Sequence, residues 1–370
     1  MIRTATITWI TFRNYGTFLQ AYALQHVLRG MGYDNRIIDD KPIIDKKFPP
    51  APPRKLSLYW KIRIRLAKIY HNIIGDIPRK PTSEDLYQKF KNQYLLLDGD
   101  FIKPEDLNER YDVFIAGSDQ IWYPNEEVFD PYFYLNFAKK KKISYAPSVG
   151  ASEYPKAFIH RSKPLLERFD HISVREQMGK NLLSSFIDKD IEVVLDPTLL
   201  LQAAEWDNVA SYPVYKGKYA FLYMLTYNEN YLNSAIQDAA RQGLKLITVS
   251  NEPRLAECVD QVVEAGPSEF VSLIKYADVV YTDSFHGTVF SLLYHKKFVT
   301  FKRFSSSSKN NQNSRLENLF NILDIQGTFL GEKECEAGVI PLAYDKNSVD
   351  EKLRKYRKLS VEYLNNSILN

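Results

Sequence analysis

The chain has 370 residues, 45% of them hydrophobic, and this is too long for one ordinary hydrophobic core, so two domains are expected. Its 49 Lys and Arg residues nearly balance its 45 Asp and Glu residues, and such a balance does not indicate a nucleic-acid partner. The two cysteines lie far apart, with no Cys or His at metal-ligand spacing, which argues against a zinc site or a disulfide framework and fits a reducing compartment.

The N-terminal part of the sequence predicts an α/β unit. Segment 3–10 alternates between polar and apolar residues, which is typical of a strand rather than a signal peptide. A turn at 14–16, a helical pattern over 17–31 and an extended pattern over 35–39 follow, and this order opens a parallel sheet. No window reaches the roughly 18–20 apolar residues that a bilayer-spanning helix needs. We therefore expect a soluble, cytoplasmic protein.

Segment 41–105 interrupts this order as an insertion. Its first part, 41–55, contains five prolines and is predicted to be an irregular loop. The next part, 54–75, carries six basic residues and no acidic one, interleaved with Tyr59 and Trp60. This pattern is typical of a peripheral contact with an anionic membrane surface, here the inner face. The alternative is a solvated insertion helix that packs on its own domain.

Apolar strands return after the interruption, each ending in a turn rich in Gly, Ser, Asp or Arg. The strands are predicted at 111–117, 142–150, 171–176, 192–200, 218–227, 244–250, 278–284 and 297–301, and helices at 229–242, 267–277 and 286–296. We therefore predict two doubly wound parallel-sheet domains, 1–200 and 201–347, that bind ligands at the carboxyl ends of their strands. A final helix over 348–368 is expected to pack back on the first domain.

The strongest local signal is the segment DSFHGT at 283–288. A buried strand ends at Ser284 and a helix begins near His286 and Gly287, at the mouth of the predicted cleft. The positive end of a helix attracts phosphate or carboxylate groups, and a histidine there can give or take a proton. The alternative is a capping turn, in which Ser284 or Asp283 caps the helix and His286 is merely exposed.

Cations follow neighbouring strands at the same predicted edge. Arg175 comes after one strand and can hold a carboxylate or phosphate in a bidentate manner, the alternative being a surface ion pair with a nearby glutamate. Lys302 and Arg303 follow another strand, and we expect one of the two to point into the cleft. Arg315, beyond a polar loop, is a third cation that can fold over a bound anion, but the sequence favours the alternative of a surface residue at the start of a helix.

Two further strand ends supply candidate ligand contacts. In GSDQIW at 117–122, Asp119 is a candidate base or sugar-hydroxyl acceptor. The first strand-to-helix turn is the usual place for a phosphate or glycan contact in such folds. Neither turn has the glycine pattern of dinucleotide or P-loop sites. The cleft residues predicted from the two turns are Asn14, Tyr15, Gly16, Ser118 and Trp122.

Taken together, these segments resemble the polysaccharide pyruvyl transferase family over roughly residues 10–325. The resemblance rests on NYGTFLQAYAL, FIAGSDQIW, ISYAPSVGAS, ISVREQMGKNLL, VVLDPTLLL and YTDSFHGTVFSLLYHKKFVTF. It implies an α/β fold with two facing Rossmann-like domains around an interdomain active-site cleft, similar to GT-B glycosyltransferases. It also implies transfer of a pyruvyl group from phosphoenolpyruvate onto two sugar hydroxyls, which forms a cyclic ketal in the biosynthesis of bacterial surface polysaccharides such as capsule or exopolysaccharide.

The resemblance assigns roles to the candidate residues. His286, with Asp119, is implied to carry out the proton transfers, while the phosphoenolpyruvate donor is held by a set of residues around them. This donor set is Arg175, Lys302, Arg303, Ser284 and Gly287. The resemblance also implies a sugar acceptor, for which a lipid-linked oligosaccharide is one candidate, and it requires no metal or redox cofactor.

One position departs from the family pattern. Many members have Arg-Leu-His-Gly where this chain has Ser284, Phe285, His286 and Gly287, so the donor-gripping arginine is absent. Arg303 or the lysine before it is the candidate to replace it. The sequence leaves open a GT-B-type glycosyltransferase that uses a nucleotide sugar, and a non-catalytic glycan-binding module.

Overall fold

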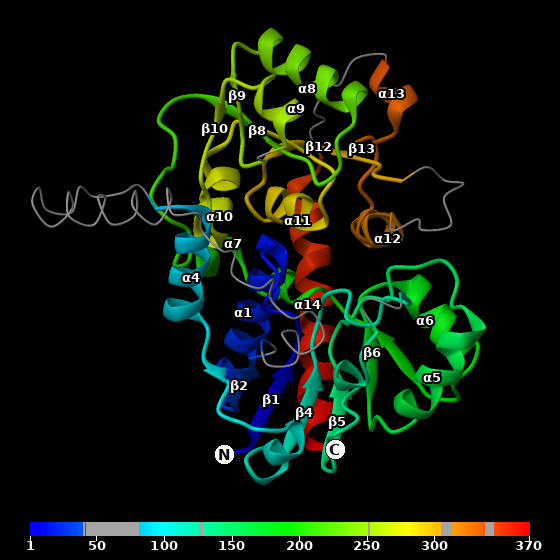
Figure 1. The fold of residues 1–370 in the computed structure, drawn as a ribbon. Coiled ribbons are helices and arrows are strands. Elements are labelled where there is room, and N and C mark those ends of the chain that lie inside the picture. The colour runs from blue at the N-terminus through cyan, green and yellow to red at the C-terminus, as the bar shows by residue number, and fades with distance from the viewer. Residues whose placement is uncertain (40, 42–80, 126–128, 251, 305–312, 337–343) are drawn as a thin grey trace, which may run out of the picture.

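The first of two parallel sheets lies in the N-terminal part of the chain (Figure 1). The computed structural model describes residues 1–39, 41, 81–125, 129–250, 252–304, 313–336 and 344–370. The first sheet has the order β3-β2-β1-β4-β5, and a bridge between Ile143 and His171 continues it to the pair β6-β7. Its strands are β1 Arg3–Ile7, β2 Asp34–Ile38, β3 Leu97–Asp98, β4 Val113–Ala116, β5 Lys141–Ser144, β6 Ile172–Val174 and β7 Ile191–Val193.

The second sheet repeats the same topology in the C-terminal part of the chain. Its order is β10-β9-β8-β11-β12-β13, and every pair in it is parallel. In both sheets the chain reverses direction beside its first strand, which is the Rossmann arrangement, and ligands bind beyond the carboxyl ends at that point. The strands are β8 Tyr219–Tyr223, β9 Lys245–Thr248, β10 Gln261–Val262, β11 Val279–Thr282, β12 Lys297–Phe301 and β13 Phe329–Leu330.

Helices cover both sheets, and their starts are fixed by local sequence. Asn14 caps α1 by accepting a hydrogen bond from the N–H of Thr17, and Ser284 caps α11 in the same way through Gly287. The α-helices are α1 Tyr15–Gly30, α4 Ser83–Tyr94, α5 Lys156–Leu166, α6 Gln177–Ser184, α7 Ala203–Trp206, α8 Glu229–Arg241, α9 Pro253–Ala256, α10 Pro267–Tyr276, α11 Phe285–Leu293, α12 Ser314–Leu323, α13 Glu332–Glu336 and α14 Lys346–Leu369. Short 3-10 helices are η1 Pro104–Glu109, η2 Pro131–Tyr134 and η3 Pro197–Leu199.

The last helix, α14, returns to the first domain and lies beside β5 (Figure 1). The hydroxyl of Tyr363 donates to the carbonyl of Ser144 at 3.0 Å. The hydroxyl of Tyr33 donates to Asn365 at 2.7 Å. Since α14 follows the second sheet in the chain, these contacts join the end of the sequence to the domain where it began.

The predicted fold class is confirmed: the protein is α/β, with two Rossmann-like domains that face each other in a GT-B-like arrangement. Several elements are shorter or different from those predicted. The strand predicted at 142–150 ends at Ser144, because Ala146 and Gly150 have left-handed φ angles of 54° and 59° that end the extended backbone. The described part of 41–105 contains α4 and β3, which belong to the fold, whereas 54–75 lies outside the described residues.

An aromatic cluster joins the two domains. The ring of Tyr15, at the start of α1, stacks on Phe270 of α10 with 4.6 Å between centroids, and on Tyr87 of α4 at 5.4 Å. Tyr223 of β8 meets the Phe270 ring edge-on at 4.8 Å. These side chains belong to one hydrophobic cluster that runs through both domains. Stacked and edge-on aromatic pairs add about 0.5–1.5 kcal/mol each beyond the burial of their area, so the cluster fixes the relative position of the domains.

Replacing Phe270 by Ala should lower the free energy of unfolding by about 3–5 kcal/mol, because the ring is fully buried and its removal leaves a cavity between the domains. Denaturant unfolding followed by circular dichroism measures the change. Tyr212→Ala is the matched control, since this aromatic side chain is 94% exposed and its loss should alter stability by less than about 0.5 kcal/mol. Equal effects of the two substitutions would contradict the role given to the cluster.

Candidate functional site

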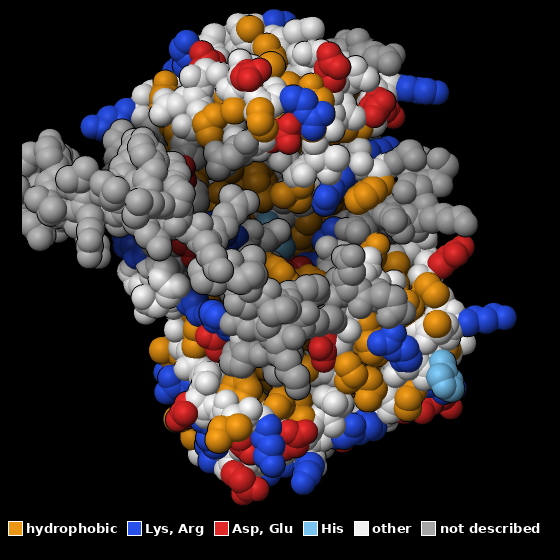
Figure 2. Space-filling model, viewed as in Figure 1, with side chains coloured by type: hydrophobic (Ala, Val, Ile, Leu, Met, Phe, Trp, Pro, Cys, Tyr) orange, Lys and Arg blue, Asp and Glu red, His pale blue; other side chains and the backbone are white. Residues whose placement is uncertain are grey.

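The carboxyl ends of the two sheets meet at the contact between α1 and the start of α11. His286 is only 8% exposed there, and its ring packs directly on the backbone of Gly16. A Cβ atom added to Gly16 would lie 1.8 Å from Nδ1 of His286, so only glycine fits at this position. Figure 2 shows a hollow between the two domains in which a histidine and apolar side chains are visible.

The carboxylate of Asp196 is the centre of a buried network. Its Oδ2 lies 2.6 Å from Nη1 of Arg175 and accepts a hydrogen bond from Ser118 at 3.3 Å. Its Oδ1 accepts from the N–H and the hydroxyl of Thr198, at 2.9 and 2.6 Å, and lies 3.6 Å from Nε2 of His286. Burial opposes ionisation, but the His286 and Arg175 charges hold the pKa of Asp196 well below its ordinary value.

Arg175 is buried, with 3% of its surface exposed, and it pairs with Asp196 rather than forming a surface ion pair. Its guanidinium lies over the ring of Phe285, with 4.7 Å between Cζ and the ring centroid. Its Nε and Nη2 have no hydrogen-bond partner among the described residues, although Glu176 Oε2 approaches Nε to 3.9 Å. A buried donor without a partner costs free energy, so the N–H groups on these two nitrogens are suited to bind a carboxylate or phosphate.

Two more arginines lie at a cavity of about 90 Å³ that His286 also lines. Arg303 donates from Nε to the hydroxyl of Thr226 at 2.7 Å. Arg315 was predicted to be a surface residue, but the start of α12 folds into the cleft and leaves it half-buried between this cavity and one of about 190 Å³ beside Arg175. Burial and the charge of Arg175 lower the pKa of Arg315 to about 10, so it stays protonated near neutral pH.

Lys302 lies on the other side of the strand end. Its Nζ is 5.3 Å from the centroid of the Phe329 ring, and it does not line the cavity with Arg303. Because successive side chains of an extended chain point in opposite directions, only one of these two neighbours can face the cleft. The expectation that one of the pair points inward is met by Arg303, and the assignment of Lys302 to the same pocket is not supported by its position.

Asp119 lines the same cavity as His286 and has an unusual backbone conformation. Its φ angle is 74°, which is uncommon for a residue other than glycine and is often found at functional sites. Its Oδ2 accepts a hydrogen bond from the hydroxyl of Thr17 at 2.5 Å, and its carbonyl accepts from the N–H of Ser148 at 2.7 Å. These contacts hold the carboxylate at the start of α1, beside the histidine.

The residues predicted to line the acceptor side divide into two groups. Asn14 lines the cavity, Gly16 packs on the His286 ring, and Ser118 binds Asp196. Tyr15 and Trp122 do not reach the cavity. Tyr15 is stacked in the interdomain cluster, and Trp122 is fully buried against Tyr134, since large aromatic rings gain most from a closed core. The structure therefore does not bring these two rings to the candidate site.

The start of α11 is both a capped helix end and part of the site. Gly287 donates its N–H to the hydroxyl of Ser284 at 3.3 Å, so this N–H is not available to a ligand. The N–H groups of Phe285 and His286 make no hydrogen bond to the described part of the chain and face the cleft end of the helix. Asp283 accepts from the N–H of Leu225 at 2.7 Å, and burial raises its pKa to about 6.

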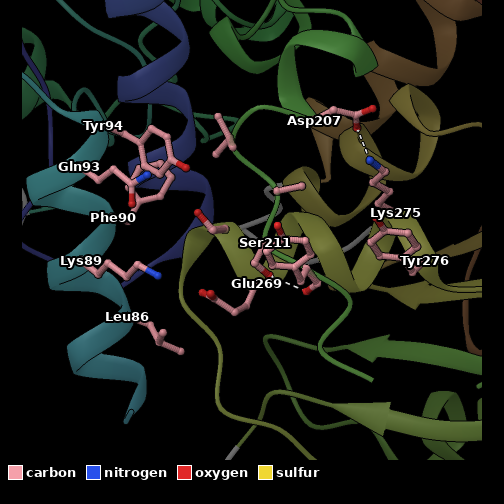
Figure 3. A pocket seen from close by; sticks show the side chains of 14 residues that line it. Leu86, Lys89, Phe90, Gln93, Tyr94, Asp207, Ser211, Glu269, Lys275 and Tyr276 are labelled. Atoms are coloured by element: carbon pink, nitrogen blue, oxygen red, sulfur yellow. Dashed lines mark hydrogen bonds and ion pairs between the residues drawn. The ribbon is translucent and has the colours of Figure 1, made fainter. Parts of the chain in front are cut away.

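Another cavity lies outside this network. It measures about 460 Å³ and is enclosed by α4, residues 207–212 and α10 (Figure 3). Lys275 and Asp207 form an ion pair of 2.8 Å at its edge. None of the residues predicted from the sequence lines it. The described residues contain no cluster of three or more His, Cys, Asp or Glu side chains that could hold a metal, and no described helix is long and apolar enough to cross a membrane.

Sequence reasoning missed Asp196, the residue on which the network depends. It follows a strand and precedes a proline, and this is the same strand-end signal that pointed to Arg175 and Asp119. The sequence does not show that Asp196 is near its partners, because Arg175 and His286 are 21 and 90 positions away. Only the folded chain brings the three residues together.

The family model for polysaccharide pyruvyl transferases matches residues 14–305. No curated protein matches the chain. Among solved structures, S. aureus MnaA with UDP is 13% identical, with a TM-score of 0.49 and coverage of 98% of this chain and 91% of that one. The UDP-GlcNAc 2-epimerase of Neisseria meningitidis with UDP-GlcNAc is 11% identical, with a TM-score of 0.45 and coverage of 99% and 100%.

The glycosyltransferase SsfS6 of Streptomyces sp. SF2575 is 13% identical, with a TM-score of 0.41 and coverage of 98% of this chain and 96% of that one. The family match covers most of the chain: it extends from the N-cap of α1 to just beyond β12 and includes every strand of the two sheets except β1 and β13. On this match, the chain belongs to the polysaccharide pyruvyl transferase family.

Proposed function

We propose that this transferase moves the pyruvyl group of phosphoenolpyruvate onto two hydroxyls of a sugar in a bacterial surface polysaccharide, such as capsule or exopolysaccharide, and forms a cyclic ketal. The observation that carries the proposal is the buried guanidinium of Arg175. Two of its nitrogens lack partners among the described residues, and it lies beside a cavity that Arg315 also lines. Such unpaired donors suit an anionic substrate.

The donor is a compact dianion or trianion with a carboxylate at one end and a phosphate at the other. Arg175 and Arg315 line the cavity of about 190 Å³, and Arg303 and Arg315 line the cavity of about 90 Å³, so cations border both spaces proposed for the carboxylate and the phosphate. The N–H groups of Phe285 and His286 at the start of α11 add donors for phosphate oxygens. This set supports the idea that arginines from β12 and α12 replace the family arginine that is absent at Ser284.

The proposed reaction needs three proton transfers. The His286 imidazolium gives a proton to the methylene carbon of the donor, and C2 becomes electrophilic. A sugar hydroxyl attacks C2 and loses its proton to a base, for which the neutral histidine or Asp119 is positioned. The bond from C2 to the phosphate oxygen then breaks, and phosphate leaves. A second hydroxyl attacks C2, loses its proton to the departing phosphate, and closes the ketal.

The acceptor is proposed to enter from the side of α1. Asn14, Asp119 and Gln120 line the cavity there, and amide and carboxylate groups are suitable partners for sugar hydroxyls. The start of α1 lies close to the histidine because Gly16 has no side chain. A lipid-linked acceptor at the inner membrane face stays a prediction, since segment 54–75 lies outside the described residues.

Purified protein incubated with phosphoenolpyruvate and acceptors bearing galactose, mannose or hexosamine should release phosphate and yield a product that mass spectrometry identifies as the acceptor ketal. Phosphoenolpyruvate should also raise the thermal unfolding temperature, because it binds only the folded state. Stabilisation by a nucleotide sugar and not by phosphoenolpyruvate would instead favour a glycosyltransferase. Oligosaccharide binding without any phosphate release would favour a glycan-binding module.

Replacing His286 by Gln should lower kcat by about 10²–10⁴-fold, since glutamine is a polar side chain of similar size that cannot transfer protons. Stabilisation by phosphoenolpyruvate should persist, because the arginines are intact. His160→Gln is the matched control, as His160 is exposed on α5 and far from the network. If His286→Gln keeps the turnover of the native protein, the proton-transfer role is wrong.

Two glycines of α1 provide a second matched pair. Gly16→Ala should lower kcat by about 10²-fold, because the new Cβ collides with the His286 ring and shifts it. The same overpacking should lower stability by about 1–3 kcal/mol. Gly30→Ala adds a Cβ that meets nothing within 4 Å, so turnover should be unchanged and stability should rise by about 0.5–1 kcal/mol. Phosphate release and denaturant unfolding measure both variants.

A further inference from the structure

The two nitrogens of the His286 ring lie in different surroundings. Nε2 is buried, has no hydrogen-bond partner among the described residues, and lies 3.6 Å from Oδ1 of Asp196. Nδ1 lies on the other side of the ring, against the backbone of Gly16 at the start of α1, where Asn14 lines the cavity. One nitrogen therefore faces a carboxylate of the first domain, and the other faces the proposed acceptor side.

Asp196 cannot easily turn away from the histidine. Both of its oxygens are held: Oδ1 by the N–H and hydroxyl of Thr198, and Oδ2 by Arg175 and Ser118. The side chain is fully enclosed, with 1% of the residue exposed. An ionised carboxylate only accepts hydrogen bonds, so the nitrogen that faces it must carry the proton whenever the ring is neutral.

We infer that Asp196 is the positioning residue for His286: it holds the proton on Nε2 and so leaves Nδ1 to exchange protons with the substrate. The proton exchange with substrate rests on the proposed function. The position of the ring beside Asp196, and the tautomer that follows from it, do not depend on that function. The distance of 3.6 Å exceeds hydrogen-bond length by less than about 1 Å. Catalytic hydrogen bonds are often long before substrate binds, and a small approach of the two domains completes this one.

The other charged groups near the ring do not offer Nε2 a competing acceptor. Arg175, Arg303 and Arg315 are donors only. Asp283 and Asp119 line the cavity, but among the described residues Asp196 is the carboxylate that lies within 4.0 Å of a nitrogen of the ring. Asp196 is therefore the carboxylate that determines which nitrogen is protonated. A purely structural Asp196, which only neutralises Arg175, would impose no preference between the two nitrogens.

The test is the tautomer of His286 in the full-length protein without substrate. Selective ¹⁵N-histidine labelling and a long-range ¹H–¹⁵N spectrum, recorded at a pH where the ring is neutral, distinguish the two forms, and the signal missing from His286→Gln gives the assignment. We expect the form with the proton on Nε2. A proton on Nδ1, or an equal mixture, would overturn the inference whatever the donor substrate proves to be.

Asp196→Asn provides the second readout. This variant should lose the preference for Nε2–H, and its kcat for ketal formation should fall by about 10²-fold, because the ring is no longer held in one form. Asp112→Asn is the matched control, as this carboxylate pairs with Arg3 at the surface, and both readouts should match the native protein. A retained preference for Nε2–H in Asp196→Asn would contradict the inference. If that variant does not fold, the native spectrum alone decides.

Discussion

The ion pair between Asp196 and Arg175 is the interaction on which the site depends. Removing two charges from water costs several kcal/mol for each ion, and a single contact does not offset this cost. Here the pair is 2.6 Å long, and hydrogen bonds from Thr198 and Ser118 complete the carboxylate. Each carboxylate oxygen thus has hydrogen-bond partners, while two nitrogens of the guanidinium have none among the described residues. The asymmetry leaves a cation with unpaired donors beside the cleft, and this is the electrostatic feature on which the proposed anionic donor depends.

The number of charged side chains does not reveal this unpaired cation, because acidic side chains are as frequent as basic ones around the cleft. The difference lies in what each group binds. Glu176 accepts from the N–H groups of Val149 and Gly150, and Asp283 accepts from the N–H groups after β8. These carboxylates stabilise loops at the ends of strands. Arg175 has no comparable set of backbone acceptors among the described residues, so two of its nitrogens stay buried without a partner beside the cavity.

The sequence was sufficient to predict the longer strands and the strand ends that surround the site, because both follow from local periodicity and turn residues. It did not predict the two-residue strands β3, β10 and β13 or several helices, including α4, α5 and α6. It was not sufficient to predict which way a side chain points after a strand ends. A difference of one residue separates Arg303, which lines the cavity, from Lys302, which does not. Trp122 was misjudged for a related reason, since an aromatic residue suits a sugar-binding cleft and a closed core equally well.

The position of Tyr15 shows how packing between the domains and the chemistry of the site are connected. Its ring belongs to the interdomain cluster through Phe270, and the next residue, Gly16, touches the ring of His286. Two adjacent residues in the first turn of α1 therefore have different roles: Tyr15 packs against the second domain, and Gly16 contacts the histidine of the candidate site. Because His286 belongs to the second domain and Asp196 to the first, the distance between them is set by this packing. The aromatic interface leaves the two groups just beyond hydrogen-bond length, so a small shift would bring them together. In the proposed reaction, a substrate that binds both domains would supply the free energy for that shift.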